Sequence, residues 1–146
     1  MKSRLFVAAL AVVALVVAGS LRAADDKKPD LKCPVSGQPA KADKTAEFNG
    51  GTVQFCCDKC PVAFAKDSKK FAGKANLQLV QTKQLKQVKC PLTARPMADD
   101  KIVDVGGTEI KVCCAGCLGK MKKLEGDALI TALLSDTSKG FEAAKK

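Results

Sequence analysis

Hydrophobic and polar residues alternate most clearly over residues 52–56, where Val53 and Phe55 fall on one face. This period of two predicts a strand with one buried side. Asn49-Gly50 stands just before it and favours a hairpin turn, because both residues tolerate positive φ. Residues 45–48 are therefore expected to form the partner strand.

A helical pattern follows this hairpin. Asp58 can cap a helix that begins near Cys60, and Pro61 suits its first turn. Gly73 is expected to end the helix. In residues 74–88, aliphatic side chains alternate with glutamines, which predicts an extended segment that packs on the hairpins.

The whole pattern returns 57 residues later without a gap. Residues 99–105 and 109–113 predict a second hairpin, and residues 115–124 a second helix. A further helix is expected at residues 128–134, followed by a frayed tail. The shift carries each cysteine of a first set onto one of a second set: Cys33, Cys56, Cys57 and Cys60 onto Cys90, Cys113, Cys114 and Cys117.

These elements predict the α+β class, with two tandem ββα units joined by an extended segment and followed by a short C-terminal helix. The expected parts are a signal peptide at 1–24, a flexible lead-in at 25–31, a first four-cysteine unit at 32–73, a connecting segment at 74–88, a second four-cysteine unit at 89–125, and a helix and tail at 126–146.

The first residues resemble an export signal in their pattern. Lys2 and Arg4 precede an apolar run over residues 5–18, which is too short to span a bilayer. Small residues follow and allow cleavage near Asp25, although an uncleaved anchor is the competing interpretation. We expect an exported, periplasmic or extracellular protein with no membrane segment after the signal is removed.

Composition narrows the function further. The chain has a net charge of +10, but its lysines are scattered without interleaved aromatic residues, so a solvated surface is favoured over nucleic-acid binding. It contains no histidine, and no paired carboxylates stand out, so a hydrolase is not supported. Units this small rarely bury enough apolar surface to fold without disulfides or a metal. The thiols are the candidates for that stabilisation.

The cysteine spacing is typical of a site for a soft or borderline metal ion. A turn at Cys33, a strand end at Cys56-Cys57 and a helix start at Cys60 can deliver thiolates to one point. A helix N-terminus stabilises a thiolate, which makes Cys60 and Cys117 the most ligand-like residues. Zinc or copper is the expected ion, and the sequence identifies no protein partner.

The vicinal cysteines pose a geometric problem. Neighbouring side chains of a strand point to opposite faces, so Cys56 and Cys57 reach one ion only if the strand breaks between them. Continued alternation would place Cys57 on the apolar face with Val53 and Phe55, whereas Cys57-x-x-Cys60 is the better chelating spacing. All four cysteines of each set therefore stay candidate ligands.

The spacings Cys33-x22-Cys56-x3-Cys60 and Cys90-x22-Cys113-x3-Cys117 resemble those of the TRASH and YHS group of treble-clef metal-binding modules. This resemblance covers both units and implies a zinc-ribbon-like ββα fold that binds zinc, copper or another heavy metal. Ser36 and Thr93 stand where many relatives have a second cysteine of the opening, and the Tyr-His-Ser signature is absent. The fourth ligand is left open.

Two other functions compete with metal binding. Eight cysteines in an exported chain can form four disulfides in a structural or interaction domain. Cys57-x-x-Cys60 and Cys114-x-x-Cys117 could instead serve a thiol–disulfide oxidoreductase, although the surrounding βαβ pattern of a thioredoxin-like fold is missing. A metal-binding protein without enzymatic activity is the favoured interpretation.

Overall fold

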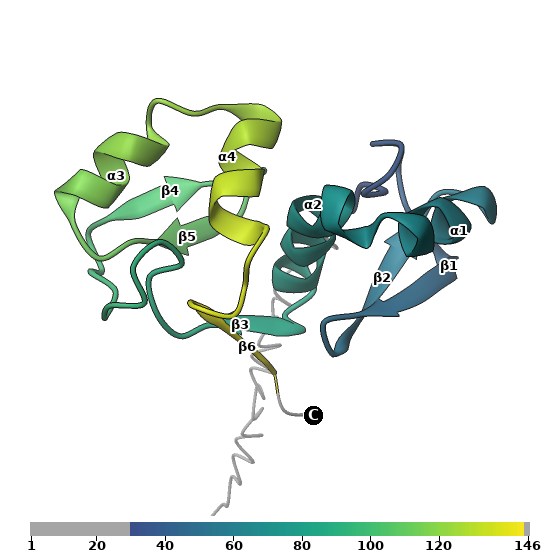
Figure 1. Ribbon diagram of the computed structural model, residues 1–146, viewed down its shortest axis with the longest axis horizontal. Helices are drawn as coiled ribbons and strands as arrows, with labels where there is room; N and C mark the ends of the chain where they lie inside the picture. The colour runs from purple at the N-terminus through teal and green to yellow at the C-terminus, as the bar shows by residue number, and fades with distance from the viewer. Residues whose placement is uncertain (1–29, 145–146) are drawn as a thin grey trace, which may run out of the picture.

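The computed structural model describes residues 30–144, so the expected signal segment 1–24 lies outside the described residues. The described chain has the predicted α+β character, with four helices and three two-stranded antiparallel sheets (Figure 1). In chain order the elements are β1 Lys41–Phe48, β2 Gly51–Phe55, α1 Lys59–Lys66, α2 Ser68–Gln81, β3 Leu85–Gln87, β4 Ile102–Asp104, β5 Glu109–Lys111, α3 Ala115–Met121, α4 Gly126–Leu134 and β6 Phe141–Ala143.

Both predicted hairpins are present. In the first, Asn49 and Gly50 adopt φ of 48° and 76°, which lets β1 turn directly into β2. In the second, Gly106 and Gly107 adopt φ of 60° and 78° between β4 and β5. The side chain of Val53 is fully buried, as the alternation along β2 predicts.

The expected extended segment at 74–88 is wrong over most of its length. Helix α2 continues through Gly73 to Gln81, and only β3 is extended. The buried side chains of Ala72, Ala75 and Leu79 follow the spacing of a helix face. Glycine suits position 73 because a Cβ there would lie only 3.3 Å from the Cγ2 atom of Ile130 in α4.

The expected cap of α1 is also wrong. Asp58 has helical backbone angles and makes no side-chain hydrogen bond to the helix. Its carboxylate instead lies 2.7 Å from the ammonium group of Lys44 on β1. The carboxylate of Asp67 does cap a helix, because it accepts a hydrogen bond from the backbone N–H of Lys70 at the start of α2.

The two halves of the chain meet at a central joint, where α2 packs against α4 and β3 pairs with β6 (Figure 1). Equivalent elements 57 residues apart meet here, since the strand pairs Leu85–Ala143 and Lys86–Glu142 exchange under the shift. The joint thus has an approximate two-fold relation. The expected fraying of the tail is wrong over its described residues, 135–144, because Phe141 is buried and β6 is paired.

One buried polar side chain crosses this joint. Asn76 of α2 is fully buried; its Oδ1 atom accepts a hydrogen bond of 2.8 Å from the Asn49 side chain, and its Nδ2 atom donates one of 2.7 Å to the Leu134 carbonyl. It therefore connects the β1–β2 turn to the end of α4.

Each half has its own hydrophobic core, and cysteines belong to both. The first core consists of Cys33, Val53, Phe55, Cys60, Phe64, Ala75, Leu79 and Leu85. The second consists of Cys90, Val103, Val105, Ile110, Val112, Cys117, Met121, Leu133, Leu134 and Phe141. Among residues 30–144, no helix has the length and apolar character needed to cross a bilayer.

Candidate metal centre

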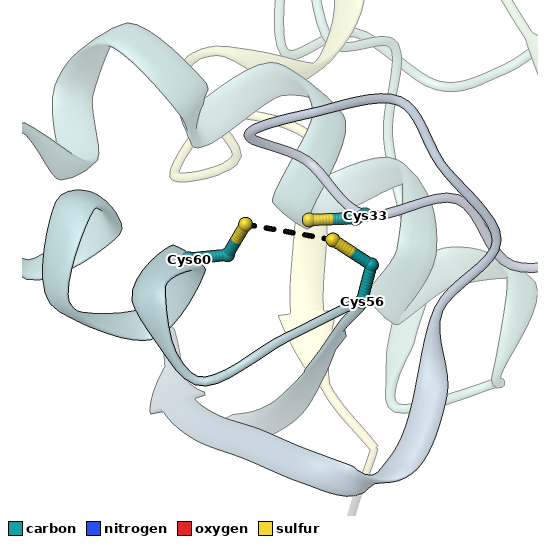
Figure 2. A group of neighbouring side chains, drawn as sticks. All are labelled: Cys33, Cys56 and Cys60. Atoms are coloured by element: carbon teal, nitrogen blue, oxygen red, sulfur yellow. Dashed lines mark hydrogen bonds between the residues drawn. The ribbon is translucent and has the colours of Figure 1, made fainter.

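Three cysteines of the first half converge on one point. The Sγ atoms of Cys33, Cys56 and Cys60 all lie within 4.8 Å of one another, with 3.6 Å between Cys56 and Cys60. Figure 2 shows their side chains pointing toward one another from a loop, a strand end and a helix start. Cys33 and Cys60 are buried and Cys56 is half-buried. Three thiolates at this separation can hold a single thiophilic ion.

Local chain geometry explains this convergence. The loop at Cys33 closes on itself, because its carbonyl accepts from the N–H of Gly37 at 2.8 Å and its N–H donates to the carbonyl of Gln38 at 2.7 Å. Gly37 permits this turn with φ of 74°. Strand β2 ends at Phe55 and α1 begins at Lys59, so the short bend between them brings Cys56 to within 3.6 Å of Cys60 in the first turn of α1.

The second half repeats the cluster with Cys90, Cys113 and Cys117, whose Sγ atoms also lie within 4.8 Å of one another. The distance between the Sγ atoms of Cys113 and Cys117 is 3.7 Å. The loop at Cys90 closes in the same way, with the N–H of Ala94 donating to the Cys90 carbonyl at 2.9 Å. Two stretches of different sequence thus build the same arrangement.

The remaining two predicted ligands, Cys57 and Cys114, lie outside these groups and are exposed. Of the alternatives left open for the vicinal pair, the one in which Cys57 continues the apolar face of β2 is wrong, because the strand ends at Phe55 and the chain bends over the next residues. This bend separates the vicinal pair and turns Cys56 toward the cluster. Cys57 stays close to the edge of the cluster, with its Sγ atom 3.5 Å from that of Cys60.

All eight cysteines of the chain lie in the described part, and all are free thiols. The structure therefore brings six of the eight candidate ligands into two equivalent groups of three. None of the disulfides considered from the sequence is formed.

The thiols of one cluster differ in acidity. Burial alone would raise the pKa of Cys33, but hydrogen bonds from the Ser36 hydroxyl and from backbone N–H groups lower this pKa to about 7. Burial raises the pKa of Cys60 to about 12, and hydrogen bonds with neighbouring thiols add to the effect, which is opposite to the thiolate form expected at the helix start. The pKa values of Cys90 and Cys117 shift in the same directions, to about 7 and about 12. A cation therefore meets a thiolate at Cys33 near neutral pH and displaces a proton from Cys60.

Two hydroxyl groups lie beside the clusters, at positions that the sequence marks only as departures from the resembled motif. The Oγ atom of Ser36 lies 3.1 Å from the Sγ atom of Cys56, and the Oγ1 atom of Thr93 lies 3.2 Å from that of Cys113. Both are hydrogen-bonding distances for sulfur. The sequence does contain a signal for these two residues, because they are 57 positions apart, as the equivalent cysteines are, and both carry a hydroxyl.

Comparison with known proteins adds no assignment: no family model, curated protein or solved structure matches this chain.

Proposed function

We propose that the protein is an exported metal-binding protein that holds one thiophilic metal ion in each of its two cysteine clusters. The observation that carries this proposal is the duplicated group of three convergent thiols, built from the equivalent residues of both halves. The same three thiols converge again 57 residues later, so we attribute the arrangement to a shared role and not to coincidence.

Zinc, copper and other heavy metals all suit a thiolate-rich site. We also propose that both halves are treble-clef units of the TRASH and YHS type, and the turn, hairpin and helix around each cluster together with the cysteine spacing support this. A bound ion would replace thiol protons and cross-link loop, strand and helix in each small core. Holding the ion requires no catalytic group, and we propose no enzymatic activity and no nucleic-acid partner.

Metal content tests this function. The reduced full chain is loaded under inert gas, desalted and analysed for metal and free thiols, and two ions per chain are expected. Cys60→Ser and Cys117→Ser should each remove one ion, and the double variant both, because each substitution takes one thiol from one group of three. Failure of the wild-type chain to retain any thiophilic metal, with its thiols already oxidised on mild isolation, would favour the disulfide-stapled alternative instead.

A second candidate function, thiol–disulfide exchange, is favoured by one observation. The exposed thiol of Cys57 lies 3.5 Å from the buried thiol of Cys60. In such an exchange Cys57 would be the attacking thiol and Cys60 the resolving thiol. Insulin reduction by the metal-free protein measures this activity. Activity that disappears in Cys57→Ser would support exchange, and its absence in the wild type would dismiss it.

A further inference from the structure

Each thiol cluster has a hydroxyl group at its edge, in the same place in both halves. Ser36 and Thr93 follow their loop cysteines by three residues, and each touches the strand-end cysteine, at 3.1 Å from Cys56 and 3.2 Å from Cys113. Both residues are exposed, so they lie on the solvent side of their clusters. The inner side is closed by the hydrophobic core.

Within the described chain, no fourth thiol or carboxylate lies within 4.8 Å of all three members of either cluster. Cys57 and Cys114 are exposed and lie outside the groups of three, although the Cys57 thiol lies 3.5 Å from that of Cys60. Asp58 is paired with Lys44, and alanine takes its place in the second half. The chain has no histidine. Each site therefore offers three convergent thiols and one neighbouring hydroxyl.

Ions differ in how well this set suits them. Zinc in protein sites of structural type takes four ligands, usually cysteine or histidine. A neutral hydroxyl is a hard, weak donor and a poor substitute for a fourth thiolate. The cuprous ion is softer and is satisfied by few thiolates. A hydroxyl that donates a hydrogen bond to one of these thiolates stabilises its charge without binding the ion.

We propose that the clusters select a soft, three-coordinate monovalent ion of the Cu(I) class, and that Ser36 and Thr93 are the residues that set this selectivity. They occupy the open side of each cluster with a hydrogen-bond donor where a zinc site would place a fourth thiolate. This inference rests on the proposed metal-binding function and specifies its ligand.

The test compares Cu(I) and Zn(II) on the reduced full chain under inert gas. Affinities are measured by competition with chromophoric chelators, and the number of sulfur neighbours by X-ray absorption. We expect two Cu(I) ions, each with three sulfur neighbours. The double variant Ser36→Cys/Thr93→Cys should raise zinc affinity by about 100-fold or more, because it completes a four-thiol set. Ser36→Ala/Thr93→Val should weaken Cu(I) binding by about tenfold through loss of the hydrogen bond to the thiolate.

The matched control is Cys57→Ser/Cys114→Ser, which removes the two exposed thiols and should change Cu(I) affinity by less than about threefold. Tight binding of two zinc ions with four sulfur neighbours, abolished by this control, would overturn the inference and identify Cys57 and Cys114 as fourth ligands. That outcome would leave the proposed function intact. Binding of neither ion would refute the proposed function itself.

Discussion

The side chain of Asn76 offers a direct test of how the two halves are held together. Replacing it with alanine removes the bonds to Asn49 and to the Leu134 carbonyl. Leu134 is the last residue of α4, so its carbonyl has no partner within the helix. Leaving this buried group unpaired costs about 1–3 kcal/mol, and losing the partly exposed bond to Asn49 about 1 kcal/mol more. Alanine regains about 0.5 kcal/mol of helix propensity.

We therefore expect Asn76→Ala to lower the free energy of unfolding by about 1.5–3.5 kcal/mol. Urea denaturation of the reduced, metal-free chain measures this loss, and with a typical urea dependence the midpoint should fall by about 1–2 M. Gln81→Ala is the control, because Gln81 lies on the same helix and its side chain makes only an exposed bond to the Gly106 carbonyl. A change in Asn76→Ala no larger than in this control would refute the reasoning. Metal content should stay at that of the wild type, because Asn76 belongs to neither cluster.

Three further predictions concern two glycines of the second half and the response to pH. A Cβ at Gly140 would lie 2.8 Å from the Cα atom of Pro91, so Gly140→Ala should cost about 1–3 kcal/mol in urea denaturation and weaken metal binding only at the second cluster. Gly119→Ala, where nothing lies within 4 Å, should instead stabilise α3 by up to about 1 kcal/mol. Since the pKa values of Cys33 and Cys90 are about 7, these thiols are ionised above neutral pH and release no proton there. Calorimetry in buffers of different ionisation enthalpy should show about one more proton released per ion at pH 6 than at pH 8; an equal number at both would contradict these pKa values.

The parts of the fold that depend on local chemistry could be predicted from the sequence. Asn49-Gly50 and Gly106-Gly107 specify their turns by themselves, because both positions of each turn need positive φ. The convergence of cysteines could be anticipated as well, since a loop, a strand end and a helix start bring them together in both halves.

Features that depend on distant partners could not be predicted. Residues 74–81 fit both a strand and a helix period, and the choice is made by α4, which packs on α2 from the other half of the chain. The sequence predicts a helix end at Gly73, because the close approach of Ile130 that requires a glycine there is invisible in the sequence. Which cysteine of the vicinal pair points into the cluster depends on the single residue at which β2 ends, and the sequence does not specify that residue.

A joint made of corresponding elements has a consequence for how the chain meets copies of itself. A second molecule presents the same helix and strand surfaces that α4 and β6 offer to α2 and β3. Two chains can therefore exchange their second halves and form the same joint between molecules, which is a domain swap. The short connection at Val88 and Lys89 opposes this exchange, because the N–H groups of both residues donate to the Gly140 carbonyl within one chain. Refolding at high concentration favours such interlocked dimers, and dilute refolding favours the closed monomer.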